Sequence, residues 1–353
     1  MLADILSDRV READLYERID KNRVRCMACG HCCPIPEGRP GVCKVRFHRD
    51  GKLYAPWGYV AGAHADPIEK KPFFHVEPGS VAFSFGMLGC DLHCPYCQNW
   101  LSSQALRDPE AVGLPRSTSP QELVRRAVRE GARSVISTYN EPLITAEWAV
   151  AIFREAKASG LMTGFVSNGN ATPKALEYLR PWTDLYKVDL KSFSDRNYRR
   201  LGGRLEPILE SIQRIHQMGF WLEVVTLVVP DFNDSEAELR SIAEFLARLS
   251  PDIPWHVSAF HPDYRMSDRG WTGWDRLRRA ARIGQEAGLR YVYAGNLPGA
   301  DQDLESTRCH SCRTTLVRRV GFRVLENSIP PSGACSRCGT VIPGVWSGGR
   351  STQ

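Results

Sequence analysis

The chain has 353 residues, of which 42% are hydrophobic and 24% charged, a composition typical of globular proteins with a buried core. Forty-six basic and 40 acidic residues give a net charge of +6, which is too small to argue for nucleic-acid binding. No apolar run approaches the roughly 18 residues of a membrane span. The charged residues 1–20 exclude a secretory signal, so we expect a cytoplasmic protein without a membrane partner.

Short β-branched runs alternate with helix-like segments between residues 81 and 294. The predicted strands are 81–88, 134–138, 162–167, 185–190, 222–229, 256–260 and 291–294. The predicted helices are 119–130, 145–158, 173–179, 205–218, 235–249 and 274–287. A glycine follows four of these helices, as a C-terminal cap requires. Alternation of this kind predicts parallel strands with helical crossovers.

Two α/β architectures fit this alternation: an open doubly wound sheet and a full or partial (β/α) barrel. Polar residues at the predicted strand ends favour the barrel, because a barrel brings those ends to one rim where ligands bind. They are Tyr139–Glu141, Ser167–Gly169, Asp189, Lys191, His261 and Asn296. The alternative is that they serve only as turn and cap residues. We predict four regions: a cysteine-rich N-terminus (1–75), a partial barrel (76–300), a ribbon-like module (301–346) and a flexible tail (347–353).

The twelve cysteines form three groups, at residues 26–43, 90–97 and 309–338. They are too few for a disulfide scaffold, and the chain shows no export signal. Clustered cysteines in a reducing cytosol indicate metal ligation.

The central group, Cys90-x3-Cys94-x2-Cys97, directly follows the first predicted barrel strand. Three thiolates on one short loop can each bind one iron of a [4Fe–4S] cluster, which leaves the fourth iron open. The alternatives are a zinc knuckle or unligated buried thiols.

This motif, with Tyr96 before its last cysteine, resembles the radical S-adenosylmethionine (SAM) superfamily. The resemblance implies that the open iron binds SAM and that one electron cleaves the sulfonium. The resulting 5′-deoxyadenosyl radical would abstract hydrogen from a protein, peptide or small-molecule substrate, which makes the protein an oxidoreductase. It also implies an electron donor such as flavodoxin or ferredoxin.

Four further segments occur in the order found in enzymes that activate pyruvate formate-lyase: 138–142, 167–169, 189–191 and 260–262. In those enzymes the first is a glycine-rich element ending in Glu. The resemblance implies that Glu141, beside Asn140, lies near the SAM amino group. It places Ser167 and Asn168 near the ribose or carboxylate, and Asp189, Lys191 and His261 around the pocket. Activating enzymes often have Asp at the position of Val166. The resemblance therefore does not extend to a monovalent cation bound at this position.

A resemblance to the AmmeMemoRadiSam-system radical enzyme covers almost the whole chain. The segments that carry it are 24–26, 41–46, 66–72, 97–100, 254–256, 260–264 and 293–299.

The two flanking cysteine groups indicate further metal sites. Cys309-x2-Cys312 and Cys335-x2-Cys338 are typical of a zinc ribbon, serving either as a structural clasp or as a rubredoxin-like iron carrier. Near the N-terminus, Cys26, Cys29, Cys33 and Cys43 can hold zinc or a second cluster, with unligated buried thiols as the alternative. Cys32 is extra to the family pattern.

Two functions remain open at this point. The first is a radical SAM enzyme. The second is a non-catalytic zinc-ribbon protein that binds nucleic acid or protein; few aromatic residues accompany its basic residues, so nucleic acid is not favoured.

Overall fold

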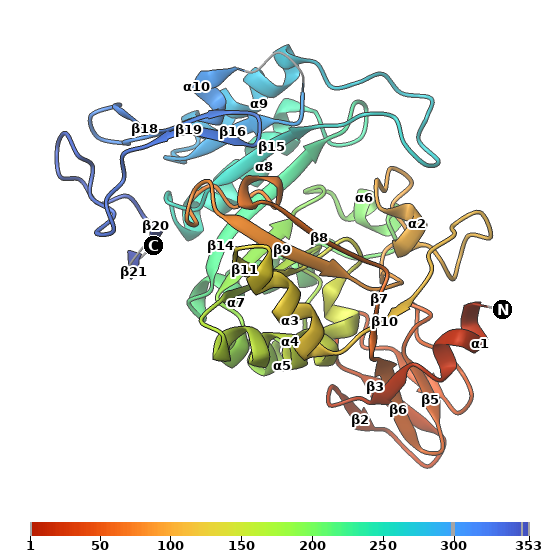
Figure 1. The fold of residues 1–353 in the computed structure, drawn as a ribbon. Coiled ribbons are helices and arrows are strands. Elements are labelled where there is room, and N and C mark those ends of the chain that lie inside the picture. Colours follow the sequence, from red (N-terminus) through yellow and green to blue (C-terminus); the bar gives the residue numbers. More distant parts are fainter. Residues whose placement is uncertain (1, 298–300, 347–348, 352–353) are drawn as a thin grey trace.

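The computed structural model describes residues 2–297, 301–346 and 349–351, and a curved eight-stranded sheet lies at its centre (Figure 1). The strands follow the order β16-β15-β14-β13-β12-β11-β9-β8. Their bounds are β8 Gly62–Pro67, β9 Val81–Gly86, β11 Ala132–Ser137, β12 Met162–Ser167, β13 Leu185–Asp189, β14 Trp221–Val228, β15 Trp255–Ala259 and β16 Val292–Gly295. All neighbouring strands from β9 to β16 are parallel, and β8 pairs antiparallel with β9. Because β8 and β16 are the two ends of the sheet, the barrel is incomplete, as predicted.

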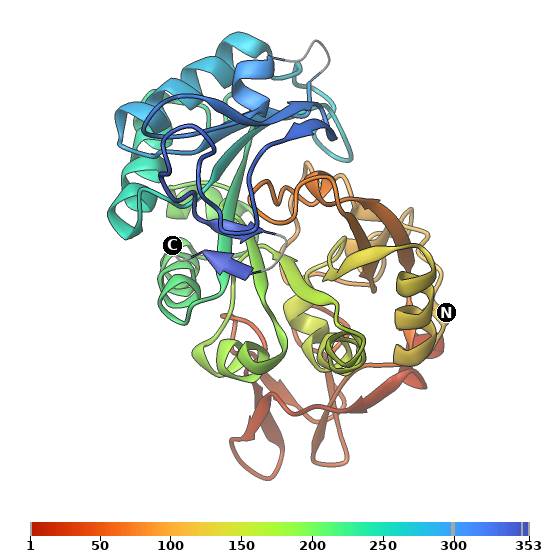
Figure 2. The same cartoon turned by 60° about the vertical axis from the view of Figure 1, so that its left-hand side comes forward.

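Six crossover helices cover the outside of this sheet (Figures 1 and 2). They are α3 Pro120–Arg129, α4 Ala146–Ala158, α5 Pro173–Leu179, α7 Leu205–Gln217, α8 Glu236–Leu249 and α9 Trp274–Glu286. Each lies within one or two residues of its predicted bounds. Ser119 begins α3 with a capping box closed by Glu122, and the Ser235 hydroxyl accepts from the Glu238 amide at the start of α8. Local sequence therefore determined where these helices begin.

The N-terminal region forms two small antiparallel sheets after helix α1 (Leu2–Ser7). One contains β1 Val10–Glu12, β5 Phe47–Arg49 and β6 Lys52–Pro56, and the other β2 Tyr16–Arg18, β3 Arg23–Cys26 and β4 Pro34–Pro36. The buried Arg46 guanidinium holds this region to the barrel through two 2.7 Å hydrogen bonds to the Glu147 carboxylate of α4. The boundary predicted at residue 75, between the N-terminal region and the barrel, would leave β8 in the N-terminal region. In the structure β8 pairs with β9 and belongs to the central sheet.

The C-terminal region packs over the β16 end of the sheet, opposite the N-terminal region (Figure 2). After α10 (Gln302–Glu305), strands β17 Thr307–Arg308, β18 Thr315–Val320 and β19 Arg323–Asn327 form an antiparallel sheet. Then β20 (Gly344–Trp346) pairs with β21 (Gly349–Ser351). Within the tail predicted to be flexible (347–353), residues 349–351 pair with β20 as a strand, whereas residues 347–348 and 352–353 lie outside the described part of the chain.

The remaining elements are short. They are β7 Tyr59–Val60, β10 Arg116–Ser117, α2 Trp100–Ser103, α6 Asp195–Arg200 and the 3-10 turns η1 Ile68–Lys70, η2 Pro142–Thr145 and η3 Arg180–Trp182. None of the helices in the described ranges is long and apolar enough to span a bilayer.

Candidate active site

A cavity of about 820 Å³ lies at the carboxyl ends of the barrel strands. Parallel strands bring these ends to one edge, so loops far apart in sequence share one wall. All eleven residues predicted for the cluster and SAM line it: Cys90, Cys94, Tyr96, Cys97, Asn140, Glu141, Ser167, Asn168, Asp189, Lys191 and His261. The fold therefore brings together what the sequence placed on five separate loops.

The three central cysteines follow β9 on one loop at the cavity wall, where Cys94 is buried and Cys90 and Cys97 are partly buried. Burial raises the pKa of each thiol, and that of Cys94 reaches about 12. The Leu92 amide donates to Cys90 Sγ at 3.4 Å, and the Ser103 hydroxyl lies 3.2 Å from Cys97 Sγ. Such thiols stay protonated at neutral pH until a metal displaces the proton.

The sulfur spacing tests which metal group fits. A zinc ion with Zn–S bonds of about 2.3 Å places its ligand sulfurs about 3.8 Å apart. The three central sulfurs do not all lie within 4.8 Å of one another, and no further cysteine lines the described part of the cavity. This wider set fits a [4Fe–4S] cluster, in which each cysteine binds a different iron.

The Glu141 side chain is held rigidly beside residues 90–97, the loop that carries the three central cysteines and is called the cluster loop below. Its carboxylate accepts hydrogen bonds from the Ser167 hydroxyl and the Asn168 amide, both at 2.7 Å, and from the Leu143 amide at 3.0 Å. Burial, together with the neighbouring Asp91 carboxylate, raises the Glu141 pKa to about 8. Ser167 and Asn168 therefore position Glu141 in addition to lining the cavity.

Asp91, which the sequence reasoning missed, connects three loops. The side-chain amides of Asn168 and Asn170 donate to its buried carboxylate at 2.7 Å, and His31 Nε2 lies 3.8 Å away. Asn140 acts similarly on the other side, because its side-chain oxygen accepts from the Met87 amide at 2.9 Å. Both side chains fix the cluster loop to the barrel.

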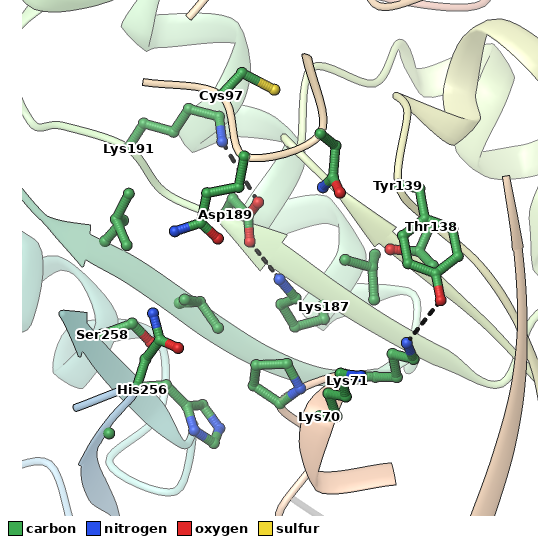
Figure 3. Close-up of a pocket in the computed structure, with 18 of the residues that line it drawn as sticks. Lys70, Lys71, Cys97, Thr138, Tyr139, Lys187, Asp189, Lys191, His256 and Ser258 are labelled. Atoms are coloured by element: carbon green, nitrogen blue, oxygen red, sulfur yellow. Dashed lines mark hydrogen bonds and ion pairs between the residues drawn. The ribbon is translucent and has the colours of Figure 1, made fainter. Parts of the chain in front are cut away.

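Asp189 at the end of β13 lies between two lysines (Figure 3). Lys187 forms a short ion pair with one carboxylate oxygen, and Lys191 Nζ lies 3.4 Å from the other. Burial opposes ionisation of Asp189, but the two ammonium groups outweigh it and lower the pKa of the carboxyl. The three groups form a charged patch on the cavity wall.

Two predicted residues lie at different depths. Tyr96 is buried, with its ring edge-on to Phe232 at 5.7 Å. The His261 Nε2 atom lies 2.8 Å from the exposed Gln98 amide, and its ring lies beside Trp271 at the cavity mouth.

Comparison with known proteins identifies this arrangement. Residues 86–246 match the model of the Radical SAM superfamily. The chain belongs to the radical SAM superfamily. It is 35% identical over 336 residues to an uncharacterized protein of Methanocaldococcus jannaschii, covering 94% of this chain and 99% of that one.

Two further similarities are more distant. The isethionate sulfite-lyase activating enzyme of Oleidesulfovibrio alaskensis is 29% identical over 139 residues, which cover 38% of this radical SAM chain and 43% of the relative. A solved radical SAM methyltransferase from Sphaerobacter thermophilus has a TM-score of 0.49 at 14% identity, covering 86% of this chain and 83% of that chain.

The four C-terminal cysteines of this radical SAM protein lie close enough together to hold one metal ion. Cys309, Cys312, Cys335 and Cys338 place their sulfurs within 4.8 Å of one another. Two pairs, Cys309–Cys338 and Cys312–Cys335, are separated by 3.6 Å, close to the edge of a zinc–thiolate tetrahedron. Hydrogen bonds from the Thr314 hydroxyl and amide lower the Cys312 pKa to about 6. The donor set fits zinc or a single iron.

The N-terminal cysteines differ from this pattern. Cys26, Cys29 and Cys43 are buried and Cys33 is partly buried, yet in the described ranges no three of their sulfurs lie within 4.8 Å of one another. Their spacing does not match a closed zinc tetrahedron, and metal binding here stays a prediction.

Lys71, Tyr139 and Lys187 also line the cavity but were not predicted as site residues. The sequence could have predicted Lys187 as a site residue, because it lies two positions before Asp189 and therefore on the same face of the predicted strand. Tyr139 lay inside the quoted Thr138–Pro142 segment. Lys71 lay inside segment 66–72, which carries the resemblance, but only tertiary packing brings the end of η1 to this edge.

Proposed function

We propose that Cys90, Cys94 and Cys97 hold a [4Fe–4S] cluster whose open iron binds SAM. When bound, this pair supplies one-electron cleavage of the sulfonium to a 5′-deoxyadenosyl radical that abstracts hydrogen from the substrate. The observation that carries the proposal is the open set of three widely spaced thiols at the wall of a cavity. A purely structural site would close with a fourth ligand.

The protein's own groups would bind and orient SAM. Glu141, fixed by Ser167 and the Asn168 amide, offers carboxylate oxygens to the SAM amino group. Asp189 suits the ribose hydroxyls and Lys191 the SAM carboxylate, because ammonium–carboxylate hydrogen bonds are the strong ones. The buried Tyr96 excludes water beside the cluster loop, and His261 lies at the mouth where a substrate enters.

The finer assignment that we propose is an AmmeMemoRadiSam-system radical enzyme related to glycyl-radical activating enzymes. Its support is the chain-wide set of matching segments and the similarity to activating enzymes. The substrate would be a protein, a peptide or a small molecule, with flavodoxin or ferredoxin as electron donor. Zinc in the C-terminal site completes the proposed cofactors.

The test is anaerobic reconstitution of the full chain with iron and sulfide. We expect about four irons and four sulfides per chain at the central site, a number fixed by the cluster type. Reduction with dithionite in the presence of SAM should then release 5′-deoxyadenosine and methionine, measured by liquid chromatography. Uptake of zinc alone, with no iron–sulfur absorption and no SAM cleavage, would overturn the proposal.

A further inference from the structure

Four lysine ammonium groups line the cavity wall and share only a few carboxylate partners. Lys70, Lys71, Lys187 and Lys191 line it, and the ion pairs of these four ammonium groups involve only two carboxylates, Asp66 and Asp189. Among the described residues, the other acidic side chains of the lining form no ion pair with these four lysines. Glu69 pairs with Arg319, Glu141 is held by two loops, and Glu305 accepts from the Gly321 amide.

Lys71 follows η1 and has a side chain only 5% exposed. Its Nζ atom donates to Asp66 Oδ2 at 3.0 Å and to the Tyr139 hydroxyl at 3.1 Å, and it lies 4.9 Å from the centre of the Tyr139 ring. Lys70 Nζ uses the other Asp66 oxygen at 2.9 Å. One carboxylate therefore serves two ammonium groups, and burial lowers the Lys71 pKa.

Tyr139 reaches this position at a conformational cost. Its φ of +72° lies in the left-handed region, which costs a residue other than glycine roughly 1–2 kcal/mol. Gly86 makes room for it, since a Cβ at Gly86 would lie 2.9 Å from the Tyr139 Cβ. Strain that persists at a cavity wall is a mark of function. Here it places a phenol hydroxyl against the Lys71 ammonium (Figure 3).

Lys187 repeats the pattern on strand β13. It lies two residues before Asp189 on β13, so both side chains project from the same face into the cavity (Figure 3). Its side chain is 6% exposed and shares Asp189 with Lys191. Here too one carboxylate serves two ammonium groups. Burying an ammonium without a full counter-charge is costly unless a ligand supplies one.

We propose that Lys71, supported by the Tyr139 hydroxyl, and Lys187 bind an anionic group of the substrate, a carboxylate or a phosphate. The inference rests on the proposed function, in which SAM takes Lys191 and leaves Lys71 and Lys187 for the second ligand. The cavity, at about 820 Å³, lies near the upper end of single-ligand pocket sizes of roughly 300–1,000 Å³, so it has room for both.

The test is calorimetric titration of the reconstituted protein, saturated with SAM, with potassium phosphate or potassium acetate at constant ionic strength set by potassium chloride. We expect saturable binding of at least one anion. Lys71→Met and Lys187→Met should each weaken it by about tenfold or more, because each removes a charge-assisted hydrogen bond. Lys71→Arg should restore it.

The matched control is Lys70→Met. It removes the same charge from the neighbouring residue, but Lys70 is 50% exposed, so the affinity should stay within about twofold. Stronger binding of phosphate would assign a phosphorylated substrate, and equal or stronger binding of acetate a carboxylate. Iron content and the absorption of the cluster show whether each variant is folded; if Lys71→Met is not, Lys187→Met and Lys71→Arg carry the test.

Three outcomes would overturn the inference: no saturable binding, equal binding by the wild type and both methionine variants, or displacement of SAM by the anion. The last would mean that these lysines bind the SAM carboxylate. SAM cleavage is measured on the same wild-type preparation. Cleavage without anion binding removes only this inference, whereas absence of cleavage removes the proposed function.

Discussion

The cluster loop and the C-terminal module both gather cysteines around the barrel, but they arrange the sulfurs differently. In the C-terminal module four sulfurs lie within 4.8 Å of one another, and two pairs are 3.6 Å apart. In the cluster loop three sulfurs are spread more widely and line the cavity. A closed set of four saturates a small ion, whereas an open set of three leaves a coordination position for a ligand.

The two cysteine groups also differ in their contacts with the rest of the protein. The C-terminal module contributes part of the cavity wall, through Gly321 and Phe322, and a metal ion bound by its four cysteines would add folding energy. The cluster loop is instead held by contacts with other segments: its own Asp91 accepts from Asn168 and Asn170, and Asn140 accepts from the Met87 amide just before the loop. The four C-terminal cysteines therefore complete a ligand set among themselves, whereas the candidate catalytic site depends on contacts that the barrel provides.

The largest effect expected is that a substitution in either cysteine group removes the metal of that group and leaves the metal of the other group in place. Cys94→Ala should abolish both cluster assembly and 5′-deoxyadenosine formation, because a cluster cannot keep its site with two thiolates, while C-terminal metal content stays unchanged. Cys335→Ala is the matched control and should lose the C-terminal metal. Metal analysis and product chromatography measure both. Loss of the C-terminal metal in Cys94→Ala would mean that the two groups were assigned wrongly.

The next effect concerns the attachment of the C-terminal module. Arg319 is fully buried, with Nε 3.4 Å from Glu69 Oε1 and hydrogen bonds of 2.8 Å to Thr307 Oγ1 and the Phe74 carbonyl. Arg319→Met should cost about 3–5 kcal/mol of unfolding free energy, because it leaves the Glu69 carboxylate buried and unpaired. Denaturant unfolding measures it. Adding Glu69→Gln should recover part of the loss, and a cost below about 1 kcal/mol would contradict the argument.

A smaller effect depends on pH. His75, between the barrel and the module, is buried with Nε2 2.6 Å from the Tyr293 hydroxyl and Nδ1 2.6 Å from the Pro343 carbonyl. Burial lowers its pKa to about 4 from an ordinary value of 6.5. Because the unfolded chain binds the proton first, stability should fall as pH drops from 6.5 to 4, by about 3 kcal/mol in total.

The control for this prediction is His75→Gln, which shares every other titrating group, the C-terminal thiols included. Unfolding free energies of both proteins at pH 7 and pH 5 isolate the His75 contribution. An equal pH dependence in the two proteins would show that His75 does not titrate in this range.

The smallest effect expected concerns the contribution of Glu141 to SAM binding. Glu141→Ala should weaken SAM binding by about tenfold or more, since a hydrogen bond to a charged group is worth about 1.5–3 kcal/mol, while the cluster still assembles. Equilibrium dialysis with labelled SAM measures the affinity, and iron content provides the control. An unchanged affinity would remove Glu141 from the SAM site.

The sequence by itself determined the elements and the chemistry carried by short motifs. Strand–helix alternation, the Ser119 and Ser235 caps and the glycines after helices are local signals, so they predicted the crossover helices to within two residues. Cysteine spacing predicted the cluster loop and a C-terminal metal site for the same reason, because one loop or one pair of turns supplies the ligands, and the four C-terminal sulfurs do lie together.

Tertiary structure decided what depends on contacts between distant segments. The antiparallel strand β8 joined the sheet, Asp91 connected the cluster loop to the loop that follows β12, and residues 349–351 paired with β20. It also brought Lys71 against Tyr139, 68 positions away, and spread the N-terminal cysteines too widely for a zinc tetrahedron. Backbone pairing and burial set these distances, and no local pattern encodes which distant partner an element meets.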